Sequence, residues 1–193
     1  MVKTIESTER TLIILKPDAV KRGLVGDILH RFEKVGLKIV GAKMLVPDIE
    51  LLTKHYPDDL VPIVGGKTKK DWDAYGIEYT ETAEEIGRMI VDATREFMQS
   101  GPVIAFVLEG PLAVEVVRKM VGTTGPKDSA PGTIRGDHAY LSLGRASLAK
   151  KGAANLIHAS GNVEEANQEI AMWFKKDEIC SDYQTVHEYL THA

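Results

Sequence analysis

The sequence predicts an α/β domain in which strands and helices alternate along the chain. Two continuous apolar runs, residues 11–15 (TLIIL) and residues 103–108 (VIAFVL), have the length of buried strands. Apolar residues recur between them at helical spacing, as at Ile28, Phe32 and Val35. Taken alone, this alternation favours a parallel sheet covered by helices. The 193 residues suffice for one domain with a sizeable core.

The first third of the chain predicts strand, helix, strand and a short helix. The first strand stops at the turn formed by residues 16–18 (KPD), and Gly36 is a natural end for the helix that follows. Residues 37–46 are rich in β-forming side chains, and Gly41 within them is expected to mark a bulge. Residues 47–56 then predict a short helix that opens at a Pro-Asp pair.

Residues 56–80 show no clean period and carry two prolines, a Gly-Gly pair and a basic cluster. We therefore expect an irregular surface excursion there. Thr82 and Glu85 then fit a capping box, and an apolar stripe from Ile86 to Phe97 predicts the helix that they begin. A Gly-Pro pair at residues 101–102 ends it, and residues 103–108 predict a central strand.

The last part of the chain predicts two more helices. Pro111 suits the first position of one helix, which Gly122 ends, and a long loop follows over residues 122–137. Residues 139–143 predict a short strand, and a stretch rich in small residues and lysine follows. Asn162 and Glu165 predict a capping box for the final helix, residues 163–174.

Composition excludes several classes of function. With 24 Lys+Arg against 28 Asp+Glu, the net charge of −4 provides no field for nucleic acid or an anionic membrane, and no specific nucleic-acid partner is expected. The longest apolar run is far too short for a membrane span, and residues 1–10 lack the apolar segment of a secretory peptide. The single cysteine, Cys180, excludes an intramolecular disulfide, so we expect a cytoplasmic protein.

Two short motifs match known sites only in part. Residues 65–68 (GGKT) have the end of a P-loop, but Val61 stands where its first glycine is required. His187 and His192 are five residues apart, so on a helix they diverge by roughly 140° and do not form a zinc pair.

His158 is the candidate nucleophile. A histidine after two apolar residues is commonly a half-buried core group, but His158 also precedes a predicted helix, whose N-terminus favours an anion. Glu169, inside that helix, could orient the imidazole or the hydroxyl of Ser160.

Four further residues predict a cradle for a polyphosphate. Arg118 lies late in one helix, Arg135 lies in a glycine-flanked loop, and Lys16 follows the first strand; Thr123 or Thr124 completes the set. Guanidinium groups pair bidentately with phosphate oxygens. Each cation alone is equally consistent with a surface ion pair or a solvated turn, so the joint pattern carries the prediction.

The sequence resembles the nucleoside diphosphate kinase family. The resemblance is carried, in the family's order, by residues 15–20 (LKPDAV), 22–26 (RGLVG), 122–126 (GTTGP), 131–137 (PGTIRGD), 155–160 (NLIHAS) and the helix after them. The matches span roughly residues 9–56 and 98–174.

The resemblance implies a ferredoxin-like α/β sandwich, an α+β fold with a four-stranded antiparallel sheet, in place of the parallel sheet. It implies ping-pong transfer of the γ-phosphate from a nucleoside triphosphate to a nucleoside diphosphate through a phosphohistidine on His158. It also implies Mg²⁺ carried on the nucleotide phosphates, with no metal ligands from the protein, and a homo-oligomer built from dimers.

The resemblance also assigns roles by position. The implied catalytic residues are His158, Glu169, Ser160, Lys16 and Tyr56. The implied nucleotide-binding residues are Lys16, Arg118, Thr124, Arg135, Asn155 and Leu143. In this assignment Arg118, Thr124 and Arg135 hold phosphates, and Lys16 and Asn155 reach the sugar and the transferring group. Leu143 is an apolar contact for the base.

The chain departs from the family pattern in three places. Gly161 replaces an aspartate, so we expect weaker metal dependence of binding. The base-stacking aromatic has no counterpart; counting back from residue 101 reaches Ile90, and Trp72, Tyr75 or Tyr79 are alternatives. Two insertions, about residues 57–80 and 146–154, interrupt an expected single domain of residues 1–193 and are expected to alter the oligomeric state.

Two other functions stay open from the sequence. One is a nucleotide-binding regulatory module of the same fold with little turnover. The other is a phosphohistidine donor to a protein partner, which would use the same His158.

Overall fold

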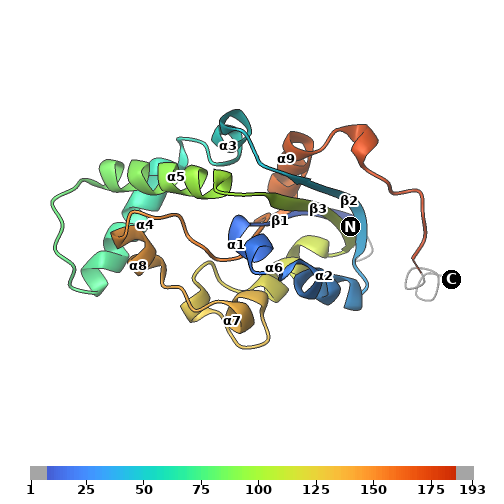
Figure 1. Cartoon of the computed structure of the whole chain (residues 1–193), viewed down its shortest axis with the longest axis horizontal. Coiled ribbons are helices and arrows are strands. Elements are labelled where there is room, and N and C mark those ends of the chain that lie inside the picture. Colours follow the sequence, from blue (N-terminus) through green and yellow to red (C-terminus); the bar gives the residue numbers. More distant parts are fainter. Residues whose placement is uncertain (1–7, 186–193) are drawn as a thin grey trace, which may run out of the picture.

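A computed structural model describes residues 8–185 and contains a four-stranded sheet in the order β2-β3-β1-β4 (Figure 1). The strands are β1 (Thr8–Leu15), β2 (Lys38–Leu45), β3 (Val103–Pro111) and β4 (Ile157–Ala159). Each neighbouring pair is antiparallel. The antiparallel ferredoxin-like sheet is thus confirmed, and the parallel sheet suggested by alternation is wrong. β1 and β2 do run in one direction, but β3 is inserted between them.

Helices cover both faces of the sheet. They are α1 (Pro17–Lys21), α2 (Val25–Lys34), α3 (Ile49–His55), α4 (Leu60–Ala74), α5 (Ala83–Gln99), α6 (Ala113–Val121), α7 (Ile134–His138), α8 (Leu143–Leu148) and α9 (Val163–Trp173). Two 3-10 turns, η1 (Pro126–Asp128) and η2 (Lys176–Glu178), complete the described elements. In Figure 1, α3 and α9 lie above the sheet and α2 and α6 below it, while α4 and α8 lie to one side.

Strand β1 contributes to two separate cores because its side chains alternate between the faces. Ile13 and Leu15 pack with side chains of α1, α2, α6 and α7. Leu12 and Ile14 pack on the opposite face with side chains of α3, α5 and α9. All four are fully buried, which explains why β1 reads as a continuous apolar run.

Local signals placed several boundaries correctly. The register of β2 shifts between Ile39 and Gly41, which confirms the bulge. Asp48 caps α3, and Thr82 and Glu85 form a full capping box at the start of α5. Asn162 accepts from the backbone N–H of Glu165 and so caps α9.

The irregular excursion expected over residues 56–80 is wrong, because residues 60–74 form the helix α4. Pro62 lies in its first turn, where a backbone N–H has no helical partner to lose. Gly65 packs so closely on α5 that a Cβ there would lie 1.8 Å from the carbonyl oxygen of Ala83. A glycine therefore stands at a buried position where an amphipathic helix usually has a large apolar residue. For this reason the sequence of α4 does not show the apolar periodicity of a helix.

Three expectations for residues 111–143 also need correction. Pro111 ends β3 rather than opening a helix, and Leu112, with φ of 50°, precedes α6. No strand forms over residues 139–143 within the described chain; Tyr140 there is 93% exposed, and α8 begins at Leu143. The loop over residues 122–137 contains η1 and the start of α7. His187 and His192 lie outside the described residues.

Between residues 8 and 185, no helix has both the length and the apolar character needed to cross a membrane.

Candidate active site

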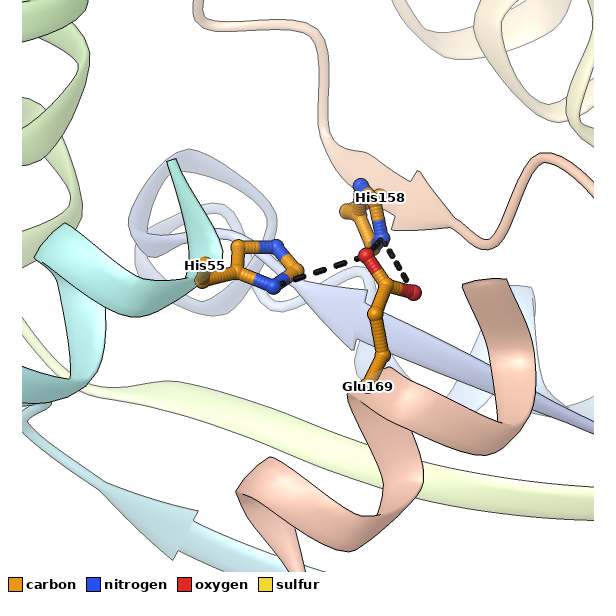
Figure 2. Close-up of side chains that lie close together, drawn as sticks. All are labelled: His55, His158 and Glu169. Carbon is orange, nitrogen blue, oxygen red and sulfur yellow. Dashed lines mark hydrogen bonds and ion pairs between the residues drawn. The ribbon is translucent and has the colours of Figure 1, made fainter. Parts of the chain in front are cut away.

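The side chains of His158 and Glu169 meet between β4 and α9 (Figure 2). Nε2 of His158 lies 2.8 Å from Oε1 and 3.0 Å from Oε2 of Glu169. A carboxylate only accepts, so it selects the imidazole tautomer with the proton on Nε2. Nδ1 then carries the free lone pair, and in Figure 2 the second ring nitrogen of His158 points away from Glu169.

Ser160 anchors the same carboxylate. Its hydroxyl lies 2.6 Å from Oε2 of Glu169, and its oxygen accepts from the backbone N–H of Leu12 at 3.3 Å. Ser160 is fully buried and Glu169 is 7% exposed. The carboxylate is therefore fixed relative to β1 as well as to His158.

His55 also faces Glu169, and the sequence did not identify it. Nδ1 of His55 lies 3.5 Å from Oε1 of Glu169, and the Trp173 indole N–H points at the same nitrogen at 3.3 Å. The rings of His55 and His158 meet edge to face, with centroids 4.6 Å apart. The only signal in the sequence was its place beside Tyr56 at the end of a helix; its partners lie more than 100 residues away.

Burial and positive charge keep both imidazoles neutral. Burial lowers the pKa of His158 to about 3, and Lys16, Arg135 and Arg118 act in the same direction. Burial, followed by the charge of His158, also lowers the pKa of His55. At neutral pH, His158 is thus a neutral nitrogen nucleophile.

Lys16 and Asn155 form a second pair beside the histidine. The ammonium of Lys16 donates to Oδ1 of Asn155 at 2.8 Å, and the amide of Asn155 donates to the carbonyl of Thr124 at 2.9 Å. Burial, and next the charge of Arg135, lower the pKa of Lys16 to about 8. This lysine is charged at neutral pH but close to losing its proton.

The backbone before His158 is held in an unusual conformation. Leu156 has a φ of 71° although it is not glycine, and its side chain is fully buried. Its carbonyl accepts from the N–H of Lys16 at 2.8 Å, and its N–H donates to the Asp18 carboxylate at 3.1 Å. The turn after β1 therefore fixes the position of β4 and of His158.

Arg135 ties the surrounding loops together. Its guanidinium donates to the carbonyls of Asn155 at 3.1 Å, Thr123 at 2.8 Å and Ile157 at 2.5 Å. It is 7% exposed, and burial lowers its pKa to about 10. Arg118, by contrast, is exposed and makes no hydrogen bond or ion pair within residues 8–185.

One cavity of about 400 Å³, the histidine cavity, brings most of the sequence-predicted residues together. Its lining includes Lys16, Tyr56, Arg118, Thr124, Arg135, Asn155 and His158. The buried Tyr56 hydroxyl has no hydrogen-bond partner there. Glu169 and Ser160 lie behind His158, outside the lining.

Leu143 lies apart from the histidine, in a neighbouring cavity that Ile90 also lines. The three aromatic alternatives do not line that cavity. Trp72 is buried and donates to Ser147 at 3.0 Å, and Tyr79 bonds to Asp73 at 2.7 Å.

The residues described around the histidine cavity include no carboxylate in its lining, so a divalent cation there would depend on oxygens of the ligand. Glu165 lies next to Gly161, since a Cβ on Gly161 would lie 2.5 Å from its Oε2. His55, His158 and Glu169 have metal-ligand spacing, but the charges of Lys16, Arg118 and Arg135 oppose a cation there.

The chain is similar to known nucleoside diphosphate kinases in sequence and in fold. The family model described as nucleoside diphosphate kinase matches residues 9–60 and 79–179, and the unmatched residues 61–78 fall on and just after α4. A nucleoside diphosphate kinase of Pyrobaculum aerophilum is 44% identical over 178 residues, covering 89% of this chain and 97% of the relative.

Two solved structures are similar over nearly the whole chain. The crystal structure of an NDP kinase from Pyrobaculum aerophilum has a TM-score of 0.86 at 42% identity, covering 91% of this chain and all of that one. A transition-state mimic of the Borrelia burgdorferi nucleoside-diphosphate kinase, with bound vanadate and ADP, has a TM-score of 0.79 at 40% identity, covering 96% and 97%. This chain belongs to the nucleoside diphosphate kinase family.

Proposed function

We propose that the protein is a nucleoside diphosphate kinase that transfers the γ-phosphate of a nucleoside triphosphate to a nucleoside diphosphate through His158. The observation that carries the proposal is the bond from Nε2 of His158 to Glu169, which leaves Nδ1 free beside a cavity with three cationic side chains. Family membership supports the same reaction.

In the first half-reaction, Nδ1 of His158 attacks the γ-phosphorus as the bond to the β,γ-bridging oxygen breaks. The nucleoside diphosphate leaves, and the phosphoryl group stays on Nδ1. In the second, a terminal oxygen of another diphosphate attacks that phosphorus, and the P–N bond breaks. No proton has to leave Nδ1, because the Nε2–H tautomer already has its lone pair there.

Glu169 supports both steps from the opposite side of the ring. As phosphorylation draws electron density from Nδ1, the imidazole becomes more positive, and the Nε2–H bond to the carboxylate strengthens. Lys16 and Arg118 neutralise the phosphate oxygens, while Arg135 fixes the loops that carry Thr124 and Asn155. Positioning and charge neutralisation supply most of the rate in phosphoryl transfer.

The lining of the histidine cavity fits Mg²⁺ that arrives on the nucleotide phosphates, since the described lining offers no carboxylate. Such an ion neutralises phosphate charge. Glu165 lies beside Gly161 and outside the described lining of that cavity.

The protein is also proposed to act in the cytoplasm as a homo-oligomer based on dimers. Its single cysteine supports the location. Apolar side chains at and just after the end of β2 support association, since Met44 is 59%, Val46 58% and Ile49 54% exposed. Light scattering gives the mass, and a monomer at micromolar concentration would contradict the assembly.

The test of the proposed function is incubation with ATP and a mixture of nucleoside diphosphates. Wild type is expected to form the corresponding triphosphates, and His158→Ala to form none. The regulatory-module alternative predicts nucleotide binding without product. Equal activity of His158→Ala would refute the mechanism.

A further inference from the structure

A second cavity, of about 320 Å³, lies between the two segments that are expected from the sequence to be insertions; we call it the insertion cavity. Its lining comes from α4, α5, the region around α8 and the loop at Thr124: Val64, Lys67, Thr68, Asp71, Ile90, Thr94, Thr124, Leu143, Gly144, Ala146, Ser147, Lys151 and Ala153. Its size lies at the lower end of the usual range for small-molecule sites, about 300–1,000 Å³.

The insertion cavity adjoins the histidine cavity. Thr124 lines both, and its carbonyl accepts from the Asn155 amide at 2.9 Å. A nucleotide with its phosphates beside His158 could extend its nucleoside end past Thr124 into the insertion cavity.

A hydrogen bond and a close backbone contact fix the walls of the insertion cavity. The indole of Trp72 on α4 donates to the hydroxyl of Ser147 on α8 at 3.0 Å. Gly152 lies against α5 so closely that a Cβ would come within 2.6 Å of the Ala93 carbonyl oxygen. Helix α4 and the segment around α8 thus pack on each other and on α5 and form one wall of the cavity.

Apolar and polar side chains occupy different parts of the lining. Val64, Ile90 and Leu143 offer apolar surface for the faces of a flat ring. Lys67 and Asp71 lie one turn apart on the same face of α4. Neither side chain makes a hydrogen bond or ion pair with any residue in the 8–185 range, so an ammonium and a carboxylate are both available to a ligand.

The four common bases differ in the edge they present to such a pair. Guanine alone offers two adjacent N–H donors, at N1 and N2, next to a carbonyl acceptor at O6. A carboxylate can accept both donors in a bidentate, charge-assisted pair while an ammonium donates to the carbonyl. Adenine, cytosine and uracil each offer at most one donor position beside an acceptor on this edge.

We propose that Asp71 and Lys67 form a base-selective edge of the nucleotide site and give the protein a preference for guanine nucleotides. Asp71 accepts from N1–H and N2–H, and Lys67 donates to O6, with the ring between Ile90 and Leu143. The inference rests on the proposed function, because it takes the insertion cavity to be the nucleoside end of the same site.

The test compares kcat/KM for GDP, ADP, CDP and UDP as acceptors with dTTP as the fixed donor. Wild type is expected to use GDP about tenfold better than the other three, the factor expected from one additional net charge-assisted hydrogen bond. Asp71→Asn is expected to remove most of this preference, and Lys67→Met to lower kcat/KM for GDP about threefold through loss of a solvent-exposed contact. Calorimetric dissociation constants for GDP and ADP, without donor, should show the same order.

Asp59→Asn and Lys70→Met are matched controls, because both residues lie at or on α4 outside the insertion cavity, and the Asp59 side chain makes no cap hydrogen bond. They are expected to leave the GDP to ADP ratio unchanged. Equal use of all four bases by wild type, or an unchanged ratio in Asp71→Asn, would overturn the inference while leaving the kinase activity intact. Absence of all transfer would instead contradict the proposed function, and the calorimetric ratio would still decide the inference.

Discussion

The ammonium of Lys16 donates to Oδ1 of Asn155 at 2.8 Å, and Lys16 as a whole is 6% exposed, so this cation is buried and feels the charge of Arg135. Because burial lowers its pKa to about 8, this lysine loses its charge within the range in which enzymes are assayed. Plots of kcat/KM against pH are therefore expected to fall above pH of about 8, since they report groups of the free enzyme.

Lys16→Arg checks the origin of that alkaline fall. The ordinary pKa of a guanidinium lies about two units above that of an ammonium, so the variant should lose the fall near 8 even if its activity is lower overall. An unchanged midpoint in Lys16→Arg would assign the titration to another group.

Glu169 fixes the tautomer and the orientation of His158, so Glu169→Gln is expected to lower kcat about 10- to 100-fold, as for loss of a charge-assisted hydrogen bond. Ser160→Ala, which leaves the carboxylate in place, should cost less. The comparison is made by steady-state kinetics at saturating nucleotide, with circular dichroism as the control for folding. A larger loss in Ser160→Ala than in Glu169→Gln would contradict this arrangement.

The two buried imidazoles predict acid instability. The folded state keeps His55 and His158 neutral, whereas their unfolded forms bind protons below pH of about 6.5. Protons then favour the unfolded chain, so the free energy of unfolding falls as the pH drops, by up to about 1.4 kcal/mol per pH unit for each histidine.

Urea unfolding at pH 7.5 and pH 5 measures this loss, with both pH values chosen to bracket the pKa of about 6.5 of an unfolded histidine. His55→Gln should show a smaller loss than wild type between the two values. His30→Gln, at an exposed position, should behave like wild type. Identical pH dependence in wild type and His55→Gln would refute this interpretation.

The close contact of α4 and α5 gives a paired stability test. Gly65→Ala puts a Cβ 1.8 Å from the carbonyl oxygen of Ala83, so the helices must separate, at a cost of about 1–3 kcal/mol in the free energy of unfolding. At Gly66, next to it on α4, a Cβ meets nothing within 4 Å, and Gly66→Ala should stabilise by about 0.5–1 kcal/mol. Equal effects at the two positions would contradict this packing.

The sequence predicts best those helices whose ends are fixed by residues close together in the chain. Thr82 and Glu85 cap α5 with each other, and Asn162 caps α9 through Glu165, three residues away. Motifs likewise located most of the lining of the histidine cavity. By contrast, the sequence does not predict α4, because the buried face of this helix contains Gly65 in place of a large apolar residue. Gly65 is required only because α5 packs directly against it in the folded chain.

Tertiary partners also explain the other failures. His55 was not identified because its contacts, Glu169 and Trp173, come from the far end of the chain. Strand alternation gave the wrong sheet because β3 inserts between β1 and β2, an arrangement that no local pattern encodes. The family resemblance supplied that topology instead.

The most direct test of the central claim is mass spectrometry of the protein after incubation with ATP and no acceptor. One phosphoryl group is expected on His158, stable in alkali and labile in acid, and it should be lost with formation of a triphosphate when a nucleoside diphosphate is added. A phosphoryl group on another residue, or one that an added diphosphate does not remove, would contradict transfer through Nδ1 of His158.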